Sequence, residues 1–213
     1  NAIYFKAHWA VPFDKDLTRE KPFYLAGGGE VSVNTMHRTG EFLYRKSEDF
    51  EMVGLPYKGG MVTFAIFLPT PGLTFDDMRP RFKAEYMDNA IAQASMSLIS
   101  LALPRLSLRW GEELREPLIA MGLGVLFGKD ANLKGITAES GVSIGEIIHK
   151  AAMDLDEEGT EAAATIANML GGSAMDIPPP IIVQVDRPFL FAIRDNTSGV
   201  NLFLGQVHNP TTD

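Results

Sequence analysis

Short apolar runs separated by turn residues dominate the sequence, and this pattern predicts a strand-rich fold. Residues 2–9 mix apolar, aromatic and small side chains, as expected of a strand buried on both faces. Residues 61–68 (MVTFAIFL) form a continuous apolar run of strand length that ends at Pro69-Thr70-Pro71-Gly72. Further strands are predicted over residues 31–33, 41–45, 51–56, 99–108, 143–156, 181–185, 189–194 and 200–207. Pro104 within 99–108 predicts an edge strand or a bend there.

Helical spacing of apolar residues occurs in two segments. Residues 73–94 are charge-rich with patchy helical spacing and predict one or two helices, and residues 114–126 predict one amphipathic helix. Neither an internal repeat nor a Ser/Gly linker divides the sequence. We therefore expect one domain of the α+β class over residues 1–213.

The composition changes abruptly at residues 157–180. This segment holds small residues, the pair Gly171-Gly172 and a run of three prolines that ends at Pro180, with little that could anchor a core. A stretch of about two dozen residues without regular structure is uncommon inside a compact domain and usually has a function. We therefore expect residues 157–180 to form a functional loop.

Composition excludes several classes of function. The net charge of −8 disfavours a nucleic-acid backbone or an anionic membrane as the main partner. The sequence has no cysteine, which excludes disulfides, a thiolate catalyst and cysteine-bound metal. None of its apolar runs approaches the ~18 residues of a membrane-spanning helix.

Motifs of enzymes and metal sites are incomplete. Gly171-Gly172-Ser173-Ala174-Met175 lacks the second glycine of a nucleophile elbow. The four histidines, His8, His37, His149 and His208, lack the close spacing of metal ligands. We expect no catalytic residues, no metal and no cofactor. Asn196-Thr197-Ser198 is formally a glycosylation sequon in a predicted turn.

Several separated segments carry the signatures of one protein family, in the order in which that family has them. They are Asn1-Ala2-Ile3-Tyr4-Phe5-Lys6 with Trp9 and Phe13, Leu55-Pro56-Tyr57, Phe67-Leu68-Pro69, His149-Lys150-Ala151, Asp156-Glu157-Glu158-Gly159-Thr160-Glu161-Ala162-Ala163-Ala164-Thr165, Asp186-Arg187-Pro188-Phe189-Leu190-Phe191, and Phe203-Leu204-Gly205 with Asn209-Pro210. Together, over nearly the whole chain, they resemble the serpins, a family of serine protease inhibitors.

The resemblance implies the multi-sheet serpin fold, with residues 157–180 as a reactive-centre loop that is either exposed or inserted into the main sheet. It also implies a longer chain, about twice this length, whose N-terminal half carries most of the helices. The implied function is suicide-substrate trapping, in which a serine protease, or as second choice a cysteine protease, forms an acyl-enzyme with the cleaved loop. The alternative is a non-inhibitory serpin-fold binding protein or chaperone. The resemblance favours a secreted protein over a cytoplasmic one.

The family's hinge falls on Glu157, Gly159, Thr160, Ala162 and Ala164. Small residues let a loop enter a closed sheet, and the period of two in a strand sends alternate side chains to opposite faces. The inward face would receive Thr160, Ala162, Ala164, Ile166, Asn168 and Leu170, and the outward face would receive Glu161. The competing interpretation is a short helix, because alanine is the best helix former.

The reactive bond is predicted between Ser173 and Ala174, by spacing from the hinge. The bracket around it takes in Met169, Leu170, Gly172 and Met175. No lysine or arginine lies between Glu158 and Arg187, so a trypsin-like protease has no cation to bind. The expected targets are elastase-, subtilisin- or chymotrypsin-like proteases.

Three further positions are predicted to control opening of the main sheet. Asn1 and His149 match residues that link the central strands by polar contacts in the family, and Trp9 is expected where the loop first enters the sheet. A neutral histidine offers one donor and one acceptor, which suits such a link. The competing interpretation is that His149 and Trp9 are ordinary core residues.

Overall fold

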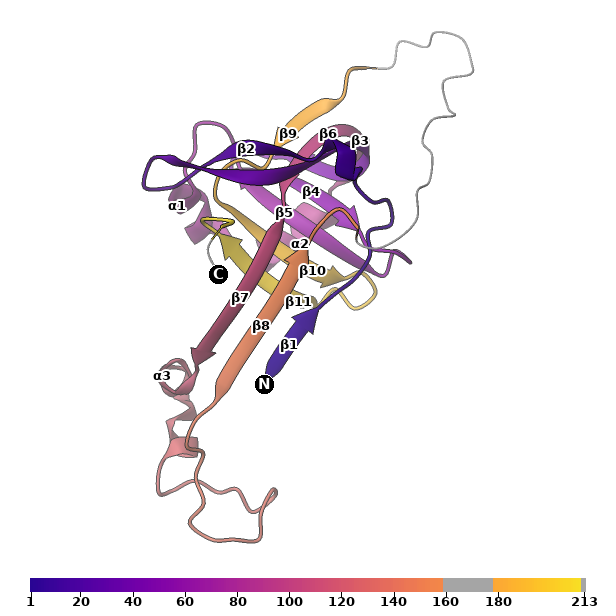
Figure 1. The fold of residues 1–213 in the computed structure, drawn as a ribbon. Helices are drawn as coiled ribbons and strands as arrows, with labels where there is room; N and C mark the ends of the chain where they lie inside the picture. The colour runs from indigo at the N-terminus through magenta and orange to yellow at the C-terminus, as the bar shows by residue number, and fades with distance from the viewer. Residues whose placement is uncertain (159–177, 212–213) are drawn as a thin grey trace. The chain divides into compact units, whose positions relative to one another are not determined.

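The computed structural model describes residues 1–158 and 178–211, which form two compact units (Figure 1). The smaller unit contains Asn1–Phe5 and Ser107–Met153, and the larger unit contains Lys6–Leu106 and the described residues from Asp154 onward. The described strands form two sheets and predominate over a few short helices, which confirms the predicted α+β class. Among the described residues, every helix is too short or too polar to cross a membrane.

The smaller unit is built on a three-stranded sheet in the order β1 (Ala2–Phe5), β8 (Ile148–Leu155) and β7 (Leu106–Glu113). Strands β1 and β8 are parallel and pair directly, from Ala2 opposite Lys150 to Phe5 opposite Met153. The prediction of a strand over 2–9 buried on both faces was wrong, because the strand ends at Phe5. Ile3 and Tyr4 are 39% and 56% exposed, since β1 is the edge strand of the described sheet.

The helix predicted over 114–126 is broken into three short pieces. They are α3 (Arg115–Leu118), a π-helical turn η3 (Ile119–Leu123) and a 3-10 turn η4 (Gly124–Phe127). Gly122 has φ of 91°, a left-handed conformation that an α-helix cannot contain and that glycine adopts without strain. The apolar spacing was therefore real, but a glycine in the middle of it stopped the helix.

The larger unit is built on an eight-stranded sheet. Its strands are β2 (Arg19–Tyr24), β3 (Glu30–Lys46), β4 (Phe50–Pro56), β5 (Val62–Pro69), β6 (Ser95–Pro104), β9 (Ile181–Gln184), β10 (Phe189–Asp195) and β11 (Asn201–Val207). The order is β11-β10-β5-β4-β3-β6-β9, with β2 paired to β3. The apolar strands β4, β5 and β10 were predicted almost to the residue, because each is buried along nearly its whole length.

Strands β2, β3, β6 and β7 differ from the expectation, and β8 begins at Ile148 rather than at residue 143. The run 99–108 is divided at Arg105 into the end of β6 and the start of β7. Strand β3 is continuous over 17 residues where two short strands were expected, and the polar β2 (REKPFY) was missed. Pairing to a neighbouring strand, rather than apolar alternation, holds these segments in the sheet.

The core of the larger unit lies on both faces of its sheet. Helices α1 (Phe75–Met78) and α2 (Ala84–Ala92) with the 3-10 turn η2 (Arg79–Arg81) fall in the segment predicted to be helical. Their buried side chains pack with strand residues in one cluster: Phe50, Met52, Ala65, Phe67, Phe75, Met78, Met87, Ala90, Leu190 and Ala192. The alternate residues of β5 and β10 point to the opposite face, where Phe64 stacks on Phe191 and contacts Trp9 edge-on.

Candidate functional site

Strand β8 leads directly into the predicted loop. Asp156, Glu157 and Glu158 are the last described residues before the segment 159–177. Glu157, the first residue of the predicted loop, is buried, with 1% of its surface exposed, although its side chain is ionisable. A buried carboxylate needs charged and hydrogen-bonding partners to remain ionised, so its surroundings identify what holds the base of the loop.

Glu157 is held by an arginine and a threonine. Arg105 Nε donates to both carboxylate oxygens at 2.9 Å, and Nη2 lies 2.8 Å from Oε1. The Thr18 hydroxyl also donates to Oε1. Burial by itself raises the pKa of the Glu157 carboxyl, but the hydrogen bonds from Arg105 and Thr18 outweigh it and hold the pKa below the ordinary value of 4.5. The side chain is therefore ionised at neutral pH.

Two further donors bind the main chain of the same segment. Trp9 Nε1 donates to the Asp156 carbonyl at 2.8 Å, and the Phe13 amide donates to the Glu157 carbonyl at 3.1 Å. We call Trp9, Phe13, Thr18 and Arg105, which bind Asp156 and Glu157, the hinge anchor. Glu158 also pairs with Lys15, but both side chains are substantially exposed, so this pair contributes little.

Local structure explains why these four donors are available. Trp9 is stacked on Tyr57 with ring centroids 4.6 Å apart, which orients its indole N–H. The Asp14 side chain caps the 3-10 turn η1 (Lys15–Leu17), which ends at Thr18. Arg105 follows Pro104 at the break between β6 and β7, where its own amide donates to the Asn34 carbonyl at 2.8 Å. Segments far apart in the sequence therefore meet at Glu157.

Asn1 and His149 lie in the smaller unit, Asn1 directly before β1 and His149 on the neighbouring strand β8. The Asn1 main-chain nitrogen donates to the Ile148 carbonyl at 2.9 Å, and the Asn1 carbonyl accepts from the Lys150 amide at 2.9 Å. These main-chain bonds bracket His149, whose ring instead packs edge-on against Trp110 with centroids 5.5 Å apart. A polar link between the Asn1 and His149 side chains stays a prediction.

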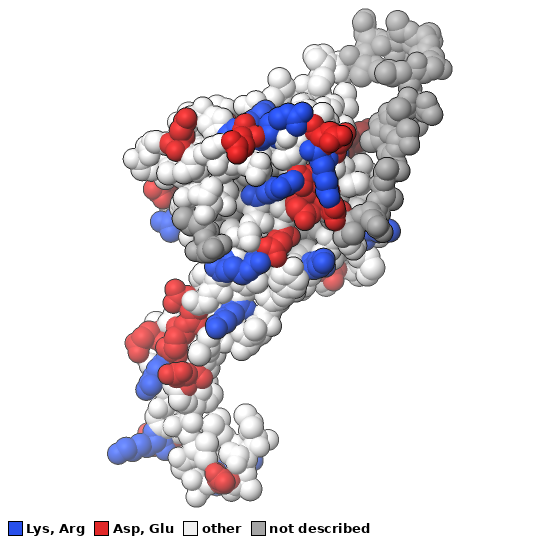
Figure 2. All heavy atoms as spheres, in the orientation of Figure 1, with Lys and Arg blue, Asp and Glu red and all other residues white. Residues whose placement is uncertain are grey.

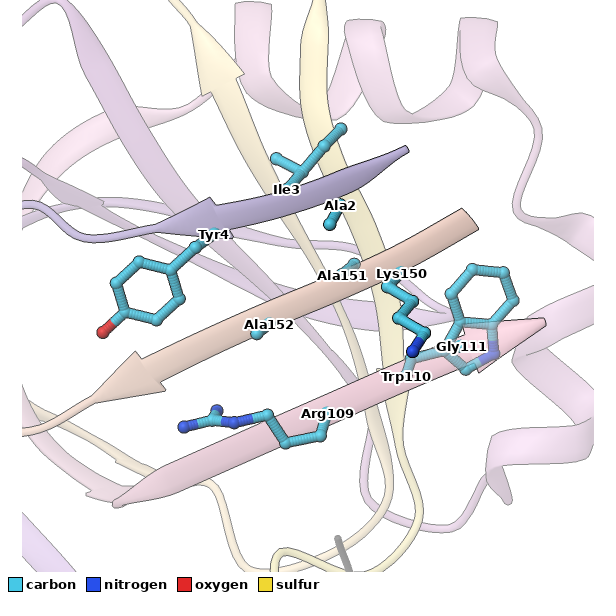
Figure 3. Close-up of a pocket in the computed structure, with 9 residues that line it drawn as sticks. All are labelled: Ala2, Ile3, Tyr4, Arg109, Trp110, Gly111, Lys150, Ala151 and Ala152. Atoms are coloured by element: carbon cyan, nitrogen blue, oxygen red, sulfur yellow. The ribbon is translucent and has the colours of Figure 1, made fainter. Parts of the chain in front are cut away.

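Small side chains lie along the seam between β1 and β8. A hollow of about 420 Å³ is lined by residues of all three strands of this sheet (Figure 3): Ala2, Ile3, Tyr4, Arg109, Trp110, Gly111, Lys150, Ala151 and Ala152. The two strands are hydrogen-bonded to each other in parallel register, so this seam is closed in the described structure. Any strand added between them must first break that pairing.

The predicted site residues are only partly within the described chain. Glu157 and Trp9 are brought close together, because Trp9 binds the carbonyl of Asp156, the neighbour of Glu157, and the other members of the hinge anchor bind Glu157 itself. Gly159, Thr160, Ala162, Ala164, Met169, Leu170, Gly172, Ser173, Ala174 and Met175 lie outside the described residues. Sequence reasoning missed Arg105 and Thr18; a charged residue directly after Pro104 in an otherwise apolar run was the one signal for Arg105.

Charge is mixed on the larger unit. In the view of Figure 2, lysine and arginine side chains lie interspersed with aspartate and glutamate over this unit. The face drawn therefore lacks the continuous basic surface that a nucleic-acid backbone requires. Among the described residues there is also no group of three or more histidine, aspartate or glutamate side chains placed to hold a metal ion.

Comparison with known proteins gives one consistent family. A family model described as "Serpin (serine protease inhibitor)" matches residues 1–210. An uncharacterized serpin-like protein of Methanosarcina acetivorans is 34% identical over 212 residues, which cover 99% of this chain and 49% of that protein. Neuroserpin of Homo sapiens is 30% identical over 220 residues, which cover 100% of this chain and 53% of neuroserpin. Antithrombin-III of Homo sapiens is 32% identical over 214 residues, which cover 99% of this chain and 46% of antithrombin-III.

A solved structure shows the same fold. The crystal structure of native protease nexin-1 with heparin superimposes with a TM-score of 0.85 at 28% identity, covering 98% of this chain and 56% of that chain. The chain thus spans about half the length of the relatives that it matches.

Proposed function

Since the chain belongs to the serpin family, we propose that the protein inhibits serine proteases as a suicide substrate. The protease serine attacks the carbonyl of the reactive bond, forms an ester with the loop and releases a new amino terminus. The loop then inserts as a strand between β1 and β8 before water hydrolyses the ester. The hinge anchor is the observation that carries this proposal.

The anchor supports the proposal because it holds the loop base through bonds that insertion must exchange. Glu157 lies two residues after the end of β8, so an inserted strand that continues β8 through it must first lose the bonds from Arg105, Thr18 and the Phe13 amide. The pairing of Ala2 to Phe5 with Lys150 to Met153 must also open. In exchange, the inserted strand gains a ladder on each side. The bonds that hold the uncleaved form can therefore be replaced by the hydrogen bonds of the inserted strand.

The proposed targets are elastase-, subtilisin- or chymotrypsin-like proteases. Residues 159–186 contain no lysine or arginine, so a protease with an acidic specificity pocket has no side chain to bind there. The proposed reactive bond joins Ser173 to Ala174, within the bracket 169–176. Ser173 and Ala174 are small and uncharged, which suits specificity pockets that accept small side chains.

The test is incubation of the natural full-length protein with elastase and with subtilisin, followed by denaturing electrophoresis. A covalent complex that survives the detergent, with loss of protease activity, is expected. Trypsin is the matched control and should form none. Cleavage of the loop while the protease keeps full activity would contradict inhibition and favour a non-inhibitory binding protein or chaperone.

A further inference from the structure

Arg38 on strand β3 holds the connector between β1 and η1. Its Nη1 donates to the Val11 carbonyl. Its guanidinium carbon lies 4.2 Å from the centroid of the Phe42 ring and 5.4 Å from that of Phe13. Cations near aromatic faces are attracted by the ring quadrupole, so Arg38 fixes both the main chain and one side chain of residues 11–13.

Residues 11–13 in turn hold the hinge. Phe13 is buried, its amide donates to the Glu157 carbonyl at 3.1 Å, and its ring contacts Trp9 edge-on with centroids 6.2 Å apart. Trp9 donates to the Asp156 carbonyl at 2.8 Å. Both main-chain bonds to the hinge therefore come from the connector that Arg38 holds.

The surroundings of Arg38 are unusual for a charged residue. Within the described part of the chain no carboxylate forms an ion pair with it, and its Nε is buried without a hydrogen-bond partner. Burial lowers the pKa of Arg38 to about 10, so it stays a cation at neutral pH. A desolvated cation kept without an acidic partner needs a reason, and its contacts with the connector provide one.

We propose that Arg38 is a positioning residue of the inhibitory mechanism. It holds the Val11–Phe13 segment in contact with the hinge and so delays the release of Glu157. This inference rests on the proposed function, because release of Glu157 matters only if the loop inserts. Arg38 does not contact the protease or the reactive bond in this scheme. Arg38 instead determines how readily Glu157 is released from the hinge anchor in the uncleaved protein.

The test compares Arg38→Met and Arg38→Lys with wild type in the natural full-length protein. Arg45→Gln is the matched control, because Arg45 lies on the same strand and also donates to a carbonyl, that of Asn89 at 3.0 Å, away from the hinge. Hydrogen exchange at the Phe13 amide and the melting temperature are measured on uncleaved protein. The melting temperature is measured again after subtilisin has cut the loop.

Arg38→Met should speed exchange at Phe13 about tenfold and lower the melting temperature of the uncleaved form by about 4 °C, with little change in the cleaved form. Arg38→Lys should recover part of both effects, and Arg45→Gln should leave exchange at Phe13 unchanged. Equal losses in the uncleaved and cleaved forms, or unchanged exchange at Phe13, would overturn the inference. If wild type gains no stability on cleavage, the proposed insertion fails, and the exchange data still decide whether Arg38 holds the hinge.

Discussion

Arg105 Nε donates to both carboxylate oxygens of Glu157 at 2.9 Å, and so joins the residue after Pro104 to the first residue of the predicted loop hinge. Glu157 is almost fully buried, whereas the Arg105 side chain is 43% exposed. The pair therefore combines a carboxylate that cannot reach water with a cation that partly can. Removing the Arg105 cation leaves a buried carboxylate without its charged partner, which costs folding free energy. Removing the Glu157 carboxylate costs less, because water can still solvate the partly exposed Arg105.

This asymmetry predicts that Arg105→Met destabilises the uncleaved protein more than Glu157→Gln does. We expect a loss of about 3 kcal/mol for Arg105→Met, because a buried carboxylate is stranded, and about 1–2 kcal/mol for Glu157→Gln. Urea unfolding of uncleaved protein measures both. Arg79→Met is the control, since Arg79 pairs with Asp76 on the surface and should cost less than about 0.5 kcal/mol. Equal losses in the three variants would contradict the role of the anchor.

The lowered pKa of Glu157 predicts a dependence of stability on acid. In the folded protein the carboxyl binds a proton less readily than in the unfolded chain, so the unfolded chain binds more protons as the pH falls. The contribution of Glu157 is fully present above its ordinary value of 4.5 and is lost as the pH falls through the lower folded value. Melting temperatures of wild type and Glu157→Gln should therefore converge below pH 4.5. A difference in melting temperature that stays constant as the pH falls well below 4.5 would show that the charge of Glu157 does not contribute to stability.

The hydrogen bond from the Trp9 indole can be removed while an aromatic ring is kept at this position. Trp9→Phe keeps an aromatic ring against Tyr57 but loses the donor to the Asp156 carbonyl. We expect the uncleaved form to lose about 1–2 kcal/mol from this bond and the smaller ring. Tyr57→Phe is the comparison variant, because it keeps the stacking partner of Trp9 and leaves the bond to Asp156 in place. Thermal melts and the rate of loop cleavage by subtilisin check the prediction, and an unchanged cleavage rate in Trp9→Phe would argue against it.

The alternation of hinge residues predicts opposite results at two neighbouring positions. Thr160→Arg places a cation on the inward face of the inserted strand, so the protein should be cleaved without trapping the protease. Glu161→Arg changes the outward face and should leave inhibition nearly intact. The number of inhibitor molecules consumed per protease molecule measures the difference. The same increase in both variants, or none in Thr160→Arg, would refute the assignment of the two faces.

The formal sequon at Asn196 is expected to remain unmodified. Asn196 Nδ2 donates to the Gly60 carbonyl at 2.7 Å and to Thr63 Oγ1 at 2.9 Å, so the nitrogen that would carry a glycan is already bound within the fold. Mass spectrometry of protein secreted from eukaryotic cells checks this. A glycan at Asn196 in folded protein would contradict the prediction and show that the folded protein does without these two hydrogen bonds.

Apolar periodicity was a reliable guide wherever a segment is buried along its length. Strands β4, β5 and β10 were predicted from apolar runs, because burial on both faces leaves no other pattern available. Apolar periodicity failed as a guide where pairing between strands, or a single glycine, decides the local structure. Strand β2 is polar and is held by β3, and Gly122 interrupts a segment whose apolar spacing is helical.

The sequence by itself determined the family and the class of fold, and it predicted Glu157 as the first hinge residue, because these follow from short contiguous motifs. Only the tertiary structure decided what holds that base. Arg105, Thr18 and Phe13 reach Glu157 from 52, 139 and 144 residues away along the chain. Such partners are set by the packing of distant strands and turns, and local sequence carries no signal of which residue will face a buried carboxylate. The direct pairing of β1 with β8 was decided in the same way, by the register of two strands about 150 residues apart.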